Sequence, residues 1–258
     1  MNAATPIVFV AILAKQKEEV LPYYLECLKN WTYPKNRIIL WVRTNNNTDA
    51  TEYILEAWLE ENANDYLSVE YDSSDHEIRV QDYGIHEWND DRFTVLKQIR
   101  NESVERATEL DADFYFISDM DNFIYPDTLD LLVERNLPVV APMLYYAPPG
   151  KMYSNFHNVA DADGYFQDNP EYAPIWNRSI SGLIKVDVVH CTYLIRRDIF
   201  DYARYTDETL HYDYVVLSRY MRDCGIPQYL DNTRLFGCLT LEENAEACRL
   251  WMEEHAYG

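Results

Sequence analysis

The sequence predicts a mixed α/β fold built on a mostly parallel, doubly wound sheet. Short apolar runs of strand length alternate with helix-length amphipathic segments through the first half of the chain. The apolar runs are continuous, which is typical of strands that are buried on both faces. Strand–helix alternation at this spacing indicates parallel strands joined by helical crossovers. With 258 residues, 48% of them hydrophobic, the chain is long enough to bury a full core.

The first elements are expected in the order strand, helix, strand, helix, strand. Residues 7–13 are an uninterrupted apolar run, and residues 21–30 carry apolar side chains at helical spacing. Residues 38–42 form the next apolar run. A helix is expected over residues 50–61, after polar residues that can cap it. The third strand is expected at residues 66–71.

A polar segment without clear periodicity separates these elements from the next ones. Residues 72–89 are expected to form a long loop, and long loops in compact domains are often functional. A long helix is expected over residues 91–110, followed by a buried strand at 114–117. A short helix should begin at Asp127, and residues 137–144 should return as a strand.

The second half of the chain, from residue 145, is rich in aromatic residues and has a weaker strand pattern. Helices are expected over residues 214–224 and 241–255. The sequence contains no recognisable linker, repeat or low-complexity segment. We therefore expect a single domain that covers residues 1–258.

Charge narrows the classes of function. The chain carries 22 basic and 44 acidic residues, a formal net charge of −22. This balance argues against nucleic-acid binding, which needs a basic patch, and against docking on anionic membranes. If the ligand carries phosphate, a divalent cation is the natural way to neutralise it locally. The alternative is that the acidic surface only keeps the protein soluble.

The N-terminal region and the cysteines bear on location. The apolar run at residues 7–14 is too short to span a bilayer, and no basic leader precedes it. The five cysteines include no CxxC pair, so neither a zinc site nor a disulfide framework is indicated. We therefore expect no membrane span and a cytoplasmic compartment with reduced thiols.

Two aspartates directly follow the buried strand at 114–117. In a doubly wound sheet, ligands bind outside the carboxyl ends of the strands, which is where Asp119 and Asp121 stand. Carboxylate oxygens are the ligands that Mg²⁺ and Mn²⁺ prefer. The same spacing occurs at two other places, Asp111 with Asp113 and Asp161 with Asp163. The pair alone could therefore be a solvated loop, but its position after a buried strand favours a metal site.

Two further segments resemble the pattern of glycosyltransferases with the GT-A fold. Arg100 and Asn101 lie on the helix before the acidic pair, where many members carry Arg-Asn facing the donor. Residues 193–200, followed by 211–213, resemble the segment that holds the base of inverting members. A carboxylate there deprotonates the acceptor hydroxyl, which makes Asp213 the candidate general base. The alternative is that Asp213 only caps a helix.

A more specific resemblance rests on many short segments that match in order along almost the whole chain. They are Leu21-Pro22-Tyr23-Tyr24-Leu25, Tyr33-Pro34-Lys35, Leu40-Trp41, Ala112-Asp113, Asp119-x-Asp121-Asn122, Leu137-Pro138-Val139-Val140-Ala141-Pro142-Met143-Leu144, Tyr153-Ser154-Asn155-Phe156, Gly164-Tyr165, Asn177-Arg178 and Val189-His190-x-Thr192. With these segments the chain resembles the N-terminal glycosyltransferase module of the procollagen galactosyltransferase family, which includes the cerebral endothelial cell adhesion molecule.

The resemblance implies a GT-A fold, Rossmann-like and typical of nucleotide-diphospho-sugar transferases. It implies a UDP-sugar donor, Mn²⁺ (or Mg²⁺) and inversion at the anomeric carbon. The reaction would move a hexose, galactose or glucose, to a hydroxyl acceptor on a protein or glycan, such as hydroxylysine of a collagen-like protein. Residues 1–144 would bind the nucleotide sugar and residues 145–258 would form the acceptor side. The eukaryotic relatives lie in the endoplasmic reticulum.

Carried over by position, the resemblance also implies roles for individual residues. Asp119 would meet the donor ribose or the metal, and Asp121 the metal. Arg100 would lie near the uracil or the diphosphate. Thr44 and Asn45, at the end of the second expected strand, would hold the base.

Two more residues fall on the sugar and acceptor side, Asn155 and His190. His190 could be a metal ligand, an acceptor contact or a buried core histidine. Two departures from the family pattern stand out: Asn45 replaces the usual Asp, and residues 233–237 lack the histidine that related enzymes use as a metal ligand. They leave open an alternative, a catalytically inactive sugar- or nucleotide-binding or adhesion module of the same fold.

Overall fold

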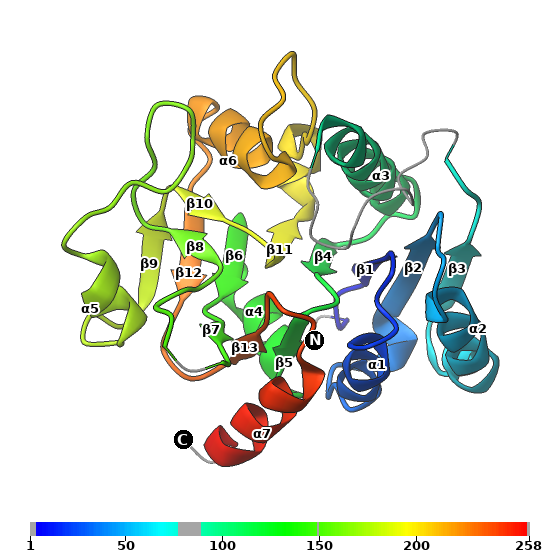
Figure 1. Ribbon diagram of the computed structural model, residues 1–258. Helices are drawn as coiled ribbons and strands as arrows, with labels where there is room; N and C mark the ends of the chain where they lie inside the picture. The colour runs from blue at the N-terminus through cyan, green and yellow to red at the C-terminus, as the bar shows by residue number, and fades with distance from the viewer. Residues whose placement is uncertain (1–3, 77–88, 149, 257–258) are drawn as a thin grey trace.

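The computed structural model describes residues 4–76, 89–148 and 150–256, and its centre is an eight-stranded sheet (Figure 1). The strand order is β3-β2-β1-β4-β11-β6-β12-β9. The strands are β1 (Val8–Ala14), β2 (Ile38–Thr44), β3 (Ser68–Asp72), β4 (Phe114–Ser118), β6 (Val139–Pro142), β9 (Leu183–Val186), β11 (Thr192–Arg196) and β12 (Gln228–Asp231).

Most strands of this sheet run in one direction, which confirms the expected mostly parallel sheet. β3, β2, β1 and β4 pair in parallel, with Val8 of β1 opposite Ile38 on one side and Phe114 on the other. β11 lies antiparallel between β4 and β6, and β9 is antiparallel to β12. Because β11 comes from the second half of the chain, the end of β4 faces residues from both halves.

The helices cover both faces of the sheet. They are α1 (Leu21–Lys29), α2 (Thr51–Asn62), α3 (Asp90–Glu109), α4 (Thr128–Arg135), α5 (Tyr172–Trp176), α6 (Asp213–Asp223) and α7 (Ala245–His255). Figure 1 shows α3 and α6 above the sheet and α1, α2 and α7 below it. The alternation of side chains along β1 explains the two cores. Val8 and Val10 pack with α1, α2 and α4, whereas Phe9 packs with α3 and α6.

Two small sheets complete the second half. One contains β5 (Asn122–Ile124), β13 (Gly237–Leu239) and β7 (Tyr145–Tyr146), and the other pairs β8 (Phe156–His157) with β10 (Val188–Val189). β5 starts one residue after Asp121 and pairs antiparallel with β13. This pairing brings the segment between β13 and α7 close to the end of β4.

Most expected elements are found within a few residues, and the exceptions have local causes. The strand expected at 66–71 begins later, as β3, because Ala63–Asp65 form a 3-10 turn (η2) before it. The strand expected at 137–144 shrinks to β6. The N–H of Leu144, the last residue of the expected strand, donates to the Asn155 side chain instead of to a neighbouring strand.

The ends of two other segments also differ from expectation. The helix expected over 241–255 begins only at Ala245, because the Asn244 side chain accepts the N–H of Ala247 and caps it there. Residues 77–88 of the expected polar loop lie outside the described residues. Among the helices that the structure describes, none has both the length and the apolarity of a membrane span.

Gly237 provides a test of the close contact between β5 and β13. It has φ +150°, and a Cβ added there would come within 2.0 Å of the Phe123 carbonyl oxygen. Gly182 has a similar φ of +148° but open space around it. We expect Gly237→Ala to lower the free energy of unfolding by at least about 2 kcal/mol more than Gly182→Ala does. Urea denaturation of both variants measures this difference, and equal losses would contradict the contact.

Candidate functional site

A cleft of about 280 Å³ opens at the carboxyl ends of β1, β2 and β4. Its lining includes Ala14 from β1, Asn45 after β2, and Asp119 and Asp121 after β4. These strand ends meet at one edge because the strands are parallel neighbours in the order β2-β1-β4. The cleft therefore lies where the strand-end residues were expected to gather.

Alternation of side chains directs both aspartates into the cleft. Met120, between them, is 1% exposed and belongs to the core on the α1 side of the sheet. The backbone of this turn is held from both sides. Asp119 N donates to the Cys191 carbonyl at 2.9 Å, and Thr240 N donates to the Asp121 carbonyl at 3.0 Å. With Met120 anchored inward, Asp119 and Asp121 both face the cleft.

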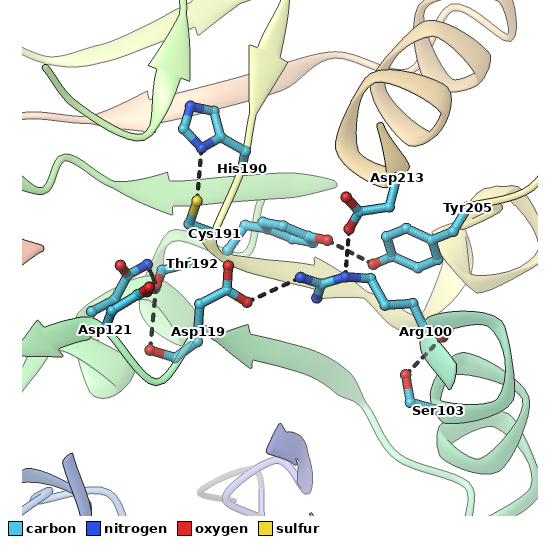
Figure 2. Close-up of polar contacts among 12 residues, drawn as sticks. Arg100, Ser103, Asp119, Asp121, His190, Cys191, Thr192, Tyr205 and Asp213 are labelled. Atoms are coloured by element: carbon cyan, nitrogen blue, oxygen red, sulfur yellow. Dashed lines mark hydrogen bonds and ion pairs between the residues drawn. The ribbon is translucent and has the colours of Figure 1, made fainter. Parts of the chain in front are cut away.

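Arg100, from α3, lies between two carboxylates (Figure 2). Its Nη2 donates to Asp119 Oδ1 at 3.0 Å, and its Nε forms an ion pair with Asp213 Oδ2 at 2.5 Å. Burial by itself lowers the pKa of Arg100, but Asp213 and Asp119 outweigh it and raise the pKa well above its usual value. Arg100 is therefore a permanent positive charge that joins α3, β4 and α6.

Asp119 carries a perturbed carboxyl group. Burial raises its pKa, and although Arg100 opposes this, the negative charges of Asp121 and Asp213 add to it. Asp119 and Asp121 nevertheless line the same cleft, where the carboxylate oxygens of both can be offered to a bound cation. Two carboxylates are also a sufficient protein contribution for Mg²⁺ or Mn²⁺, because such ions take further oxygen ligands from water and substrate phosphates. The donor set of the cleft therefore fits a divalent metal.

Lys17 is a site residue that sequence reasoning missed. Its Nζ lies 3.3 Å from Asp121 Oδ2 and also contacts Glu243 Oε1. Burial by itself lowers the pKa of Lys17, but Asp121 and Glu243 outweigh it, so the pKa is raised. Lys17 stands three residues after β1, so the strand-end rule could have identified it. Nothing local in the sequence connects it with Glu243.

The cleft gathers positive charge although the protein is strongly acidic. Five basic residues contribute to its lining: Lys15, Lys17, Arg43, Arg92 and Arg100. Burial, helped by the nearby charge of Arg92, lowers the pKa of Lys15 to about 8. Such a concentration of cations around two aspartates is suited to an anionic ligand that also binds a metal.

Of the two residues predicted to hold the base of the nucleotide-sugar donor, Asn45 lines the cleft and Thr44 does not. Asn45 lines it, and its Nδ2 donates to Asn46 Oδ1 at 2.8 Å. Thr44 is fully buried, and its hydroxyl donates to the Ala14 carbonyl at 2.7 Å, between β2 and β1. Thr44 thus connects two strands behind the cleft.

Asn155 and Asp213 also lie behind the lining of the cleft as the structure describes it. Asn155 is fully buried, donates to the Pro142 carbonyl and accepts from Leu144 N, both at 2.9 Å. It therefore holds the chain after β6. Asp213 is the first residue of α6, after Tyr212 at the cap position, so it is not the helix cap itself. Its carboxylate faces Arg100.

His190 is 2% exposed, and its Nδ1 lies 2.9 Å from Cys191 Sγ (Figure 2). Burial, with the neighbouring charge of His157, lowers the pKa of His190 well below its usual value, so the ring is neutral. Within the described part of the chain, no group of three or more His, Cys, Asp or Glu residues is arranged to hold a metal. The structure therefore does not bring His190 together with the two aspartates as a ligand set.

Comparison with known families agrees with this geometry. The family model described as glycosyltransferase family 25, N-terminal domain, matches residues 5–249. The chain belongs to glycosyltransferase family 25. Procollagen galactosyltransferase 1-A of Xenopus laevis is 34% identical to it over 243 residues, which cover 91% of this chain and 39% of that protein. Procollagen galactosyltransferase 2 of Homo sapiens is 32% identical over 259 residues, 94% of this chain and 41% of that protein.

Not every family 25 relative is named as an active enzyme. The inactive glycosyltransferase 25 family member 3 of Mus musculus is 32% identical over 245 residues, covering 92% of this chain and 41% of that protein. The chain spans about two fifths of the length of these curated relatives.

Solved structures show the fold of this family 25 chain. S. aureus TarS in complex with UDP-GlcNAc aligns with a TM-score of 0.57 at 14% identity, covering 96% of this chain and 66% of that one. The mannosyltransferase PcManGT from Pyrobaculum calidifontis, in complex with GDP-Man and Mn²⁺, aligns with a TM-score of 0.58 at 12% identity, covering 98% and 63%. The chain has the GT-A fold of these glycosyltransferases.

The Arg100 cluster can be tested through stability. Arg100→Met would leave the buried carboxylate of Asp213 and the partly buried one of Asp119 without this counter-charge, at a cost of about 3–5 kcal/mol. Arg106, on the same helix, pairs at the surface with Glu70 and Glu109, and Arg106→Met should change the melting temperature little. The double variant Arg100→Met/Asp213→Asn should recover part of the loss. Equal melting temperatures for Arg100→Met and Arg106→Met would contradict the prediction.

Proposed function

We propose that this chain is a metal-dependent, inverting glycosyltransferase that moves a hexose, galactose or glucose, from a UDP-sugar to a hydroxyl acceptor. The observation that carries the proposal is the cleft itself: two strand-end aspartates and five basic side chains line one cleft on a GT-A sheet. The names of the procollagen galactosyltransferases support galactose as the sugar and a collagen-like protein as the acceptor. Hydroxylysine is the acceptor side chain that the family resemblance implies.

The donor would lie along the carboxyl ends of the strands. Asn45, where β2 ends, would contact the nucleoside, and Lys15, Arg43 and Arg92 would attract the diphosphate. Asp119 and Asp121 would hold Mn²⁺ or Mg²⁺, which supplies charge stabilisation to the departing diphosphate. Arg100 would keep Asp119 oriented through the hydrogen bond at 3.0 Å.

The acceptor would approach from the side of α6. Asp213 is the proposed general base: it accepts the proton of the acceptor hydroxyl while that oxygen attacks the anomeric carbon from the face opposite the diphosphate. In the structure this carboxylate is paired with Arg100 at 2.5 Å. The acceptor hydroxyl therefore has to compete with Arg100 for Asp213. Residues 145–258, which supply α6, are the proposed acceptor side.

A second candidate function is a module that binds a nucleotide or sugar without turnover. It is favoured by the name of the family 25 relative from Mus musculus, which marks that protein as inactive at 32% identity. The two candidates differ in one observable property. An enzyme releases UDP from a UDP-sugar when an acceptor is present, whereas a binding module retains the nucleotide sugar unchanged.

The metal site can be tested with Asp121→Asn. The variant should lose Mn²⁺-dependent binding of UDP-galactose and UDP-glucose, measured by isothermal titration calorimetry, because it lacks one of two charged ligands. Its melting temperature should stay near that of the wild type, since Lys17 keeps its ion pair with Glu243 when Asp121 becomes neutral. Asp163→Asn, in the exposed acidic pair, is the matched control and should bind normally. If the wild type binds no UDP-sugar with Mn²⁺, the proposed function fails.

Asp213→Asn separates catalysis from binding. As the loss of a general base, it should lower kcat for UDP release by about 100-fold or more while UDP and Mn²⁺ still bind. UDP release is followed with a coupled assay in the presence of a hydroxylysine peptide. Unchanged kcat in the variant would remove Asp213 from the mechanism, and absence of turnover in the wild type with intact binding would favour the second candidate.

A further inference from the structure

The Lys17 ammonium bridges two carboxylates in the cleft. Its Nζ lies 3.3 Å from Asp121 Oδ2 and contacts Glu243 Oε1. The side chains of Lys17, Asp121 and Glu243 are only 17%, 22% and 10% exposed. They come from three segments: the β1–α1 loop, the turn between β4 and β5, and the segment between β13 and α7. One cation therefore ties together three parts of the rim.

The bridge is built from fixed backbone positions. Lys17 N donates to Thr51 Oγ1 at 2.7 Å, and the Lys17 carbonyl accepts from Leu21 N at 2.8 Å, at the start of α1. On the other side, Thr240 Oγ1 accepts the N–H groups on both sides of Glu243, from Glu242 at 3.2 Å and from Asn244 at 3.4 Å. Since both backbones are held, the contact between Lys17 and the two carboxylates is a property of the fold.

The same bridge opposes a metal. Asp121 is one of the two proposed ligands, and a divalent cation bound to it would lie near a full positive charge. Like charges a few ångströms apart in a partly buried site repel strongly. The Lys17 ammonium must therefore leave Asp121 when a metal binds there. A diphosphate in the cleft offers it a new anionic partner, whereas Glu243 remains available in both states.

We propose that Lys17 is a displaceable internal cation that makes divalent metal and nucleoside diphosphate bind cooperatively. In the structure, Lys17 neutralises Asp121. When both ligands bind, the metal takes Asp121 and Lys17 turns to the diphosphate. This inference rests on the proposed function, because it needs the metal and the nucleotide to share this cleft. By linkage, each ligand must then raise the affinity for the other by the same factor.

The test measures Mn²⁺ affinity with and without saturating UDP, using the electron paramagnetic resonance signal of free Mn²⁺. Lys17→Met should bind Mn²⁺ about 5-fold or more tightly without UDP than the wild type does, because no ammonium competes for Asp121. The factor by which UDP improves Mn²⁺ affinity should shrink by a similar amount. A residue that only contributes to binding would instead weaken every affinity when removed.

Lys15→Met is the matched control. It removes the same charge from the same cleft, but Lys15 Nζ contacts Gln16 rather than Asp121. Because Lys15 is a proposed diphosphate contact, the variant should bind UDP more weakly. At saturating UDP, however, the factor by which UDP improves Mn²⁺ affinity should equal that of the wild type, since Lys15 does not hold Asp121. If Lys15→Met and Lys17→Met raise Mn²⁺ affinity equally, the effect is general electrostatics, and the proposal is overturned.

The double variant Lys17→Met/Glu243→Gln provides a second test in case Lys17→Met alone does not fold. It removes the ammonium together with its second carboxylate and leaves the net charge unchanged. It should also bind Mn²⁺ more tightly than the wild type without UDP. Wild-type cooperativity in both Lys17 variants, with Mn²⁺ and UDP still bound, overturns this inference but not the proposed function. If the wild type binds neither Mn²⁺ nor UDP, both are overturned.

Discussion

Two carboxylates at the end of β4 can share one cleft only if positive charge surrounds them. A partly buried carboxylate without a counter-charge is costly, and Asp119 and Asp121 stand close together with a single residue between them. Arg100 compensates Asp119, and Lys17 compensates Asp121. Each of these cations also reaches a second acid elsewhere in the chain, Asp213 or Glu243. The ion pairs that stabilise the two carboxylates in the cleft therefore also connect α3, α6 and the C-terminal segment to the sheet.

The same constraint explains how an acidic protein can attract an anion. A net charge of −22 repels phosphate at long range, but the field inside a cleft depends on the nearest groups. Basic side chains from the ends of β1 and β2 and from α3 converge on the cleft. A cation bound at the two aspartates would add to this local field. Anion binding in this chain is thus a property of the cleft and not of the whole surface.

Several site residues proved to have structural positions that their sequence context did not reveal. Thr44 and Asn155 stand in segments expected to face the ligands, yet both are fully buried. Their side chains donate hydrogen bonds to backbone carbonyls of neighbouring segments. A polar side chain at a strand end can turn toward the ligand or back to the adjacent strand, and the local pattern is the same in both cases. Asn45, one residue beyond Thr44, alternates to the other side and lines the cleft.

The sequence by itself determined most elements of the first half, the mostly parallel sheet and the placement of Asp119 and Asp121 at its edge, because these depend on side-chain periodicity and on short-range alternation around Met120. Only the tertiary structure decided which charges meet. Lys17 and Glu243 are 226 residues apart, and the Asn122 and Thr192 side chains, in contact beside the acidic pair, are 70 apart. Such contacts follow from strand order and from β11 entering beside β4, and no local pattern carries that information.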